Sequence, residues 1–194
     1  RVLLVDADPQ GHATVMAGLA KEPGLYNLLV REAPFREVLR AVPPAQYHPD
    51  GHAVTGHLYV VPSNVETRSI ANSISDAFAV GDRLHELDNA IDYVIFDTSP
   101  TPSLLHGSIY LATDAIIYPT KCEYLSFDGL VESISHRQAA QTYRDKWNLG
   151  NINVMGIVPT MYRNQTVEHT ENLPDPKNRL GNPARPPLTP RTPP

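Results

Sequence analysis

The chain has 194 residues, of which 41% are hydrophobic, and its formal net charge is −5. This length and composition are sufficient for one buried core, so we expect a single α/β domain. No apolar stretch approaches the roughly 18 residues that span a bilayer, and the single cysteine, Cys122, excludes an internal disulfide and a cysteine-only metal site; we expect a cytoplasmic protein with no membrane span.

An apolar run at the start of the chain ends in two carboxylates. Residues 2–6, followed by Pro9 and Gly11, predict a buried parallel strand, whose C-terminal end is where open α/β sheets bind ligands. Residues two apart on a strand share a side, so Asp6 and Asp8 are expected to face one small volume. Two such charges favour a cation between them, and magnesium prefers oxygen ligands. The alternative for Asp8 is a cap on the following helix.

The middle of the chain alternates between predicted strand and helix. The proline-rich segment 34–56 predicts an irregular excursion at the sheet edge. A strand is expected near 58–62, and a long helix over about 65–89, where apolar residues recur at three- and four-residue spacing. Gly81 is expected to bend or split this helix.

A second strand delivers a carboxylate to its C-terminal end. A strand is expected near 92–97, where the apolar run Tyr-Val-Ile-Phe leads into Asp97, and Thr-Ser-Pro-Thr-Pro follows. In a phosphate-binding sheet this is the Walker B arrangement, in which an acid orients magnesium or its waters. The alternative is that Asp97 only starts a turn.

The C-terminal half predicts two more strands, near 114–119 and 152–158, around a helix at 126–147. Cys122 is expected to be a buried structural thiol. The alternation of strands and helices indicates right-handed crossovers and a mainly parallel, twisted sheet flanked by helices. The helical residues expected to face inward are Leu130, Val131, Ile134 and Ala139, and those expected to face outward are Arg137, Arg144 and Lys146.

Four sequence blocks, in this order, resemble the ParA/Soj family of deviant-Walker partition ATPases, relatives of MinD. They are Val-Leu-Leu-Val-Asp-Ala-Asp-Pro-Gln-Gly-His-Ala-Thr (2–14), Asp-Tyr-Val-Ile-Phe-Asp-Thr-Ser-Pro-Thr (92–101), Tyr-Pro-Thr-Lys-Cys-Glu-Tyr-Leu-Ser-Phe-Asp-Gly-Leu (118–130) and Gly-Ile-Val-Pro-Thr-Met-Tyr (156–162). The resemblance covers roughly residues 1–173 and implies a P-loop NTPase-like fold of the SIMIBI class.

The resemblance also implies a reaction, the transfer of a phosphoryl group from ATP to water with Mg²⁺ as cofactor. Asp8 would orient or deprotonate the attacking water. Asp6 and Asp97 would hold the magnesium shell. The residues implied for cofactor binding are Asp6, Gln10, Gly11 and Met161.

The family's phosphate loop, Lys-Gly-Gly-x-Gly-Lys-Thr, has no counterpart in this sequence, because no Gly-Lys pair followed by Ser or Thr occurs. We therefore expect a fold without the family's first strand, phosphate loop and first helix, and deficient ATP binding. Eight of the 19 prolines lie in residues 174–194, which predicts a disordered tail. A truncated or frame-shifted gene product is expected, with a genuine linker as the alternative.

For partners, the resemblance implies an ATP-dependent homodimer, non-specific DNA on the bacterial nucleoid and a ParB-like centromere-binding protein. The net charge of −5 means that DNA contact depends on a local basic patch, with a solvated helix face as the alternative. Candidates for the patch are Arg137, Arg144, Lys146 and Arg163.

Two other functions stay open. One is a non-catalytic remnant or protein-interaction module. The other is a nucleotide-sugar transferase that uses Asp6 and Asp8 as its metal-binding pair, although the Pro-Gln-Gly continuation argues against it.

Overall fold

A computed structural model of the protein describes residues 1–48 and 55–161. The chain divides into two compact units, Arg1–Thr113 and a second that starts at Asp114. The expected boundary between a domain of 1–173 and a tail of 174–194 lies outside the described residues. Within the described ranges, no helix is long and apolar enough to cross a membrane.

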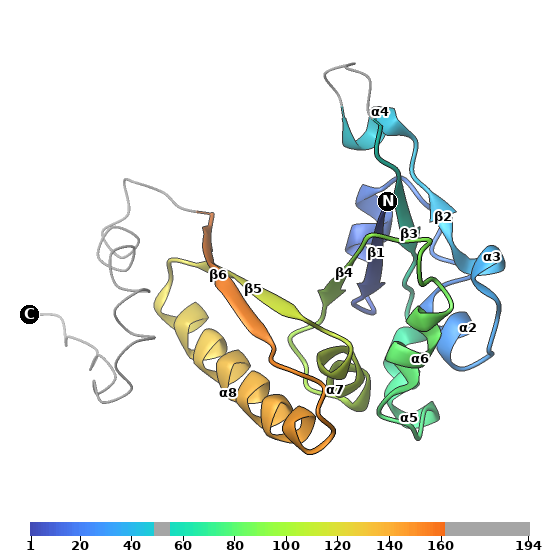
Figure 1. Ribbon diagram of the computed structural model, residues 1–194. Helices are drawn as coiled ribbons and strands as arrows, with labels where there is room; N and C mark the ends of the chain where they lie inside the picture. The colour runs from blue at the N-terminus through green and yellow to red at the C-terminus, as the bar shows by residue number, and fades with distance from the viewer. Residues whose placement is uncertain (49–54, 162–194) are drawn as a thin grey trace, which may run out of the picture. The chain divides into compact units, whose positions relative to one another are not determined.

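The first unit is an α/β sheet with short helices (Figure 1). Its elements, in chain order, are β1 (Val2–Ala7), α1 (His12–Met16), α2 (Leu25–Leu29), α3 (Phe35–Val38), β2 (Arg40–Ala41), α4 (Pro44–Tyr47), β3 (Leu58–Val61), α5 (Thr67–Ser73), α6 (Ala79–His85), β4 (Tyr93–Thr98) and α7 (Leu104–Leu111).

The sheet has the strand order β2-β3-β1-β4, with β1 near its centre. β1 pairs in parallel with both β3 and β4, whereas the short β2 pairs antiparallel with β3. The expected strands at 2–6, 58–62 and 92–97 are confirmed as β1, β3 and β4, within one or two residues at each end. A mainly parallel sheet places the C-terminal ends of β1 and β4 side by side.

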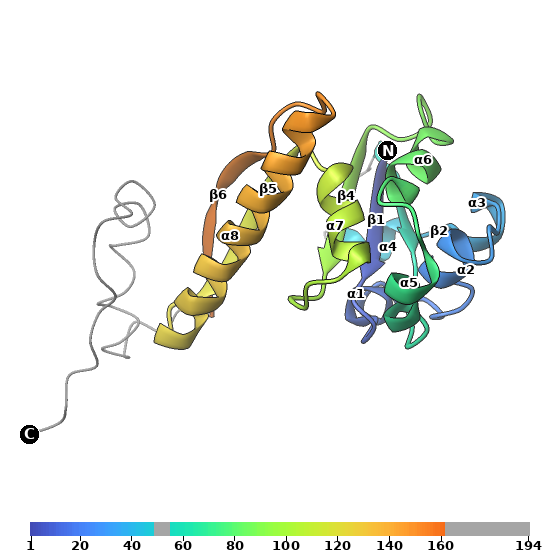
Figure 2. The ribbon, with the colours of Figure 1, turned by 90° about the horizontal axis from the view of Figure 1, so that it is seen from below.

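Helices cover one face of this sheet. Leu3 and Val5 of β1 point into a core that also contains Leu28 of α2, Ile70 of α5 and Ile109 of α7. Figure 2 shows the ribbon turned by 90°. The helices α2, α5, α6 and α7 form the layer that covers this face of the sheet. Because side chains alternate along a strand, the even-numbered residues of β1 face the other way.

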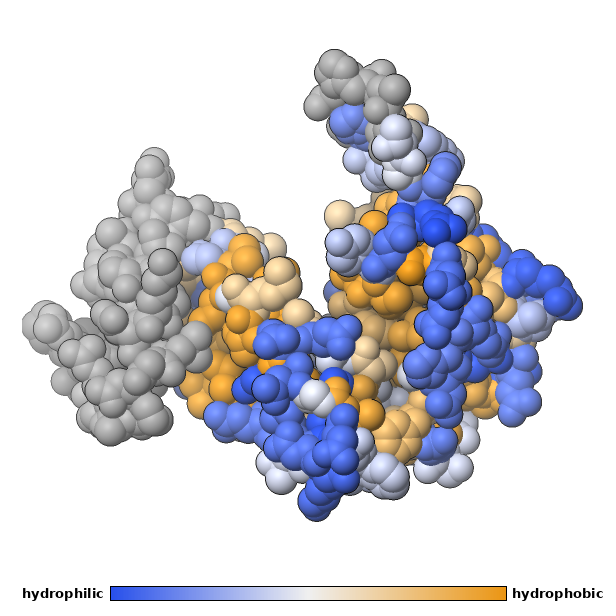
Figure 3. All heavy atoms as spheres, viewed as in Figure 1, coloured by the Kyte–Doolittle hydropathy of each residue, from blue (hydrophilic) through white to orange (hydrophobic). Residues whose placement is uncertain are grey.

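The opposite face carries exposed apolar side chains. The register pairs Leu4 with Ile95 and Asp6 with Asp97, so these residues share that face. Tyr93 is 72% exposed and Ile95 is 54% exposed. Figure 3 shows apolar atoms, in orange, reaching the surface of the first unit. The sheet therefore has one buried face and one that is open along β4.

Two expectations for the helices need correction. The segment 65–89 contains two helices, and the break falls at 74–78, before Gly81, which lies inside α6. Asp76 accepts a hydrogen bond from the backbone N–H of Phe78 at 2.8 Å, a local turn that competes with the helical ladder. The segment 34–56 was expected to be irregular but contains α3, β2 and α4. Pro44 starts α4, where a missing N–H costs nothing.

The second unit consists of β5 (Ala115–Lys121), α8 (Tyr124–Lys146) and β6 (Asn153–Thr160). The expected strands near 114–119 and 152–158 are confirmed as β5 and β6, and these two strands pair in parallel. Cys122 is buried, as expected. On α8, Leu130 is buried, but Val131 is 62% exposed, so the expectation that Val131 faces inward is wrong. Ala139 is exposed as well.

Candidate functional site

Asp6 lies at the C-terminal end of β1 and is completely buried. Its Oδ2 accepts hydrogen bonds from the backbone N–H of Thr14 at 2.8 Å and from the Thr14 hydroxyl at 2.6 Å. Its Oδ1 accepts from the backbone N–H of Asp8 at 3.2 Å. A buried carboxylate needs such partners, because burial without them is costly. Asp6 thus ties α1 to the end of β1, and three of its acceptor positions are used by its own chain.

Asp8 begins the loop that connects β1 to α1. Its Oδ1 accepts from the backbone N–H of Gln10 at 2.9 Å, and its carbonyl accepts from the backbone N–H of Gly11 at 2.9 Å. α1 is N-capped by Gly11 with no side-chain cap, so the alternative that Asp8 caps this helix is wrong. No hydrogen bond to Oδ2 of Asp8 occurs within the described residues. That oxygen remains available to a ligand.

Gly11 is fixed by space as well as by conformation. Its φ is +63°, in the left-handed region, and a Cβ atom there would lie 2.4 Å from the carbonyl oxygen of Ser63. The Ser63 hydroxyl in turn donates to the carbonyl of Asp8 at 2.7 Å. Lys21 donates from Nζ to the carbonyl of Gln10, whose side chain is exposed. The loop after β1 is therefore held against the end of β3.

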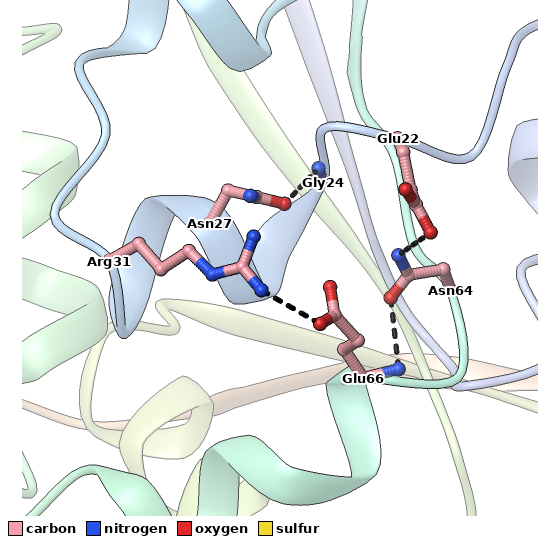
Figure 4. A network of polar contacts seen from close by, with 6 residues as sticks. All are labelled: Glu22, Gly24, Asn27, Arg31, Asn64 and Glu66. Atoms are coloured by element: carbon pink, nitrogen blue, oxygen red, sulfur yellow. Dashed lines mark hydrogen bonds and ion pairs between the residues drawn. The ribbon is translucent and has the colours of Figure 1, made fainter.

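A polar network braces the segment that follows β3 (Figure 4). The Asn64 amide donates to Glu22 at 3.0 Å, and its Oδ1 accepts from the backbone N–H of Glu66 at 3.0 Å. Arg31 pairs with Glu66 at 3.0 Å. Asn27 accepts from the backbone N–H of Gly24 at 2.9 Å. These contacts fix the chain between Ser63, which touches the loop after β1, and α5.

Asp97 is the register partner of Asp6 on the neighbouring strand. Partial burial raises the pKa of the Asp97 carboxyl, and the negative charges of Asp6 and Asp8 raise it further, whereas His12 lowers it. The charges of Asp6 and Asp8 thus act on the Asp97 carboxyl, and the expectation that Asp6 and Asp8 face one small volume stays a prediction. The accumulated negative charge of these carboxylates would be stabilised by a cation.

The fit of this cluster to magnesium can be judged from its donors. Over residues 1–48 and 55–161, no three acidic, histidine or cysteine side chains are placed so that they could hold a metal ion by themselves. Magnesium is usually held by one or two carboxylates, with waters and substrate phosphates as the other ligands. Asp97 suits that arrangement as a carboxylate ligand, and its register partner Asp6 adds negative charge.

A pocket of about 490 Å³ opens at this edge of the sheet in the first unit. Three segments line it: the loop after β1, one side of α5 and the connection from β4 to α7. Its polar groups include the carboxylate of Asp8 and the hydroxyl-bearing side chains of Ser99 and Thr101. The lining residues are Ala7, Asp8, Pro9, Gln10, Thr67, Arg68, Ala71, Ser99, Pro100, Thr101, Ser103 and Leu105.

The remaining predicted site residues belong to the second unit or lie outside the described ranges. Met161 follows β6 and is 72% exposed. Arg144 was expected to face outward but is buried, and its Nε donates to the carbonyl of Gly150 at 3.1 Å. Arg137 donates from Nε to the carbonyl of Ile152 at 3.1 Å. Lys146 is exposed, as expected, and Arg163 lies outside the described residues.

Sequence reasoning missed the residues that assemble the loop. The Thr14 hydroxyl bonds Asp6 and also accepts from the backbone N–H of Ser63 at 3.0 Å, so it joins β1, α1 and the end of β3. The Ser63 hydroxyl also lies 2.7 Å from that of Thr67. A threonine one helical turn after Gly11 was the available signal, but its partners come from distant segments.

The fold and site define a P-loop NTPase-like α/β protein, with acidic residues at the C-terminal ends of adjacent parallel strands. Solved structures agree with this fold. A McdA variant from Cyanothece in complex with ATP superposes with a TM-score of 0.72 at 16% identity, over 94% of this chain and 68% of that one. A cobyrinic acid a,c-diamide synthase from Mycobacterium smegmatis, with a bound ATP analogue and magnesium, gives a TM-score of 0.72 at 22% identity, over 92% and 70%.

The family follows from sequence. The family model AAA_31, described as an AAA domain, matches residues 1–148. The sporulation initiation inhibitor protein Soj of Bacillus subtilis is 27% identical over 168 residues, 83% of this chain and 60% of Soj. The chromosome partitioning protein ParA of Myxococcus xanthus is 31% identical over 137 residues, 67% of this chain and 44% of ParA. The chain belongs to the ParA/Soj family of ATPases within these AAA domains, and it spans about half of the length of these two relatives.

Proposed function

We propose that the chain carries the acidic half of a ParA-type ATPase site, which binds ATP and Mg²⁺ at the C-terminal ends of β1 and β4. The observation that supports this most strongly is the register pairing of Asp6 with Asp97 at the ends of β1 and β4, together with a pocket of about 490 Å³ that Asp8 lines. Bound magnesium would neutralise phosphate charge as the phosphoryl group leaves. The fold neighbours bound to ATP, or to an ATP analogue with magnesium, support the choice of ligand.

In this proposal the carboxylates have different tasks. Asp8, with its free Oδ2, orients the attacking water and accepts its proton. Asp97 holds the magnesium shell directly. Asp6 contributes its charge to that shell and, through Thr14, holds the loop in place. Gln10 and Gly11 lie on the same loop, where they would contact the nucleotide, and a nucleotide contact by Met161 stays a prediction.

The phosphate loop is the part that this sequence does not contain, since no Gly-Lys-Ser or Gly-Lys-Thr occurs in it. Positioning and charge neutralisation by that loop supply most of the catalysis in such enzymes. We therefore propose that the 194 residues alone bind ATP weakly and hydrolyse it poorly. ATP-dependent dimerisation, DNA binding and a ParB-like partner are proposed for the complete form because the family resemblance implies them; one relative is named a chromosome partitioning protein.

Calorimetry with Mg-ATP tests the proposal directly. The chain is compared with Asp8→Asn, Asp97→Asn and a version that carries the phosphate-loop segment of Soj at its N-terminus. We expect the chain to bind Mg-ATP weakly and the extended version to bind it more tightly. Asp97→Asn should abolish Mg-ATP binding in the chain and in the extended version. Equal binding by the extended protein with and without Asp97 would contradict the proposal.

The second candidate function is a non-catalytic protein-interaction module. It predicts that neither the chain nor the extended version binds Mg-ATP. A nucleotide-sugar transferase would instead bind sugar nucleotides in preference to ATP, so a sugar-nucleotide titration in the same experiment separates that possibility.

A further inference from the structure

The pocket beside Asp8 contains a cation that the mechanism above does not use. Arg68, on α5, lines this pocket together with Asp8, Ser99 and Thr101. It is the one basic side chain among the residues that the structure gives as lining it. Arg68 is exposed, and its backbone lies in the first turn of α5, braced by the Asn64 network of Figure 4.

The guanidinium group of Arg68 has no acceptor in its own unit. Within residues 1–48 and 55–113, Arg68 makes no side-chain hydrogen bond, ion pair or ring contact. The other five arginines in those ranges each contact an acceptor: Arg1 bonds Asn89, Arg31 pairs with Glu66, Arg36 with Glu37, Arg40 bonds the Glu37 carbonyl and Arg83 pairs with Glu86. Among the arginines of these ranges, Arg68 is therefore the one whose side chain contacts no acceptor, and it lines the pocket.

The pocket offers complementary groups of both signs. Asp8 presents a free carboxylate oxygen, and it acts on Asp97 together with Asp6. No ion pair joins Arg68 to Asp8, although both line the pocket. An oxyanion with a bound divalent cation would suit both kinds of group. The cation would lie at the carboxylates, and the oxyanion would lie at the guanidinium of Arg68. Magnesium-bound phosphate is that kind of ligand.

We propose that Arg68 binds the phosphoryl oxyanion of the ligand whose magnesium is held at Asp97, beside Asp8. The inference rests on the proposed function and adds a substrate-binding residue to it. The planar guanidinium donates two parallel hydrogen bonds to a phosphoryl group, a geometry that a lysine ammonium does not match. The shared chemistry is a magnesium phosphate, which either pyrophosphate or the phosphate chain of a nucleotide supplies.

Calorimetric titration with three probes tests this assignment: Mg-pyrophosphate, Mg-ATP and adenosine. The proteins are the unmodified chain, Arg68→Gln, Arg68→Lys, and Arg36→Gln as the matched control on α3, with circular dichroism to verify equal folding. We expect Arg68→Gln to weaken both phosphate probes about tenfold or more, because hydrogen bonds between charged groups are lost. Arg68→Lys should retain part of the affinity, and Arg36→Gln all of it.

The outcomes separate this inference from the proposed function. If Mg-ATP binds equally to the unmodified chain and to Arg68→Gln, the role of Arg68 is overturned and the ATP site stands. If Mg-pyrophosphate binding depends on Arg68 but ATP binds no better than adenosine, Arg68 stands and the nucleotide assignment falls. If neither phosphate probe binds to the unmodified chain, the role of Arg68 is overturned, and the version that carries the phosphate-loop segment decides the ATP site.

Discussion

At the scale of single residues, one hydroxyl group joins three segments of the site. Thr14 donates to Asp6 and accepts from the backbone N–H of Ser63. We expect Thr14→Val, which keeps the shape but removes the hydroxyl, to lower the free energy of unfolding by about 1–3 kcal/mol, since the buried N–H of Ser63 loses its acceptor and Asp6 loses one of its donors. Urea denaturation measures this. Thr14→Ser should recover most of the loss, and the exposed control Thr55→Val should change little; equal stability of Thr14→Val and the unmodified chain would refute the role.

The pKa of Asp97 makes a prediction about pH. Because partial burial and the charges of Asp6 and Asp8 raise this pKa, the folded state keeps the proton to higher pH than the unfolded chain does. The ionised carboxylate therefore destabilises the fold increasingly as the pH rises above the ordinary value of 3.8. We expect Asp97→Asn to be more stable than the unmodified chain at pH 7, with the difference disappearing below pH 3.8.

Denaturation midpoints between acidic and neutral pH measure that difference, with Asp128→Asn on α8 as the control. Added magnesium should stabilise the unmodified chain at neutral pH and leave Asp97→Asn unchanged, because it compensates the carboxylates. A variant that is less stable than the unmodified chain at neutral pH would show that Asp97 is favourably paired instead.

At the scale of elements, the loop from β1 to α1 depends on a glycine. A Cβ at Gly11 would meet the carbonyl of Ser63 at 2.4 Å, at a φ of +63°, whereas nothing lies within 4 Å of one at Gly81 in α6. We expect Gly11→Ala to destabilise the fold by about 1–3 kcal/mol through strain. Gly81→Ala should stabilise it by about 0.5–1 kcal/mol, because alanine favours helix. Thermal melts compare the two; a neutral Gly11→Ala would mean that the loop can move aside.

The turn from α8 to β6 is held by side chains that sequence reasoning assigned to DNA. Arg144 is buried and donates to backbone carbonyls of this turn, whereas Lys146 is exposed. We expect Arg144→Ala to destabilise the second unit by about 1–3 kcal/mol, because two backbone carbonyls lose a charged donor and the buried side chain is removed. Lys146→Ala should leave stability unchanged. Hydrogen exchange of β6 amides reports the unit by itself, and equal protection in both variants would contradict this assignment.

At the scale of the whole molecule, the exposed apolar face of the first sheet favours self-association. Tyr93 and Ile95 are 72% and 54% exposed on β4, the strand at one end of the sheet order. Exposed, apolar edge strands pair with other chains. We expect the isolated chain to self-associate, and Ile95→Lys to reduce this association. Light scattering over a concentration series measures it, with Val131→Lys on α8 as the control. A monomeric unmodified chain with a cooperative melt would contradict the expectation of low stability.

The sequence predicted the parts of this fold that depend on local patterns. The apolar runs that end in Asp6 and Asp97 predicted β1 and β4, because a short apolar run that is followed by proline or glycine is typical of a buried strand in a parallel sheet. Their expected proximity follows from a sheet whose strands run in the same direction. The split at 74–78 was misplaced to Gly81, since the turn at Asp76 depends on one side-chain hydrogen bond that periodicity does not reveal.

What the sequence by itself determined was the class of this protein, through the order of strands and helices and the carboxylates at the strand ends. Only the tertiary structure decided what each polar group does. It buried Asp6 against Thr14, turned Arg144 toward backbone carbonyls and left Arg68 without a partner in the pocket. The physical reason is that backbone patterns act between neighbours in sequence, whereas a side chain's partners come from segments that meet only once the sheet has formed.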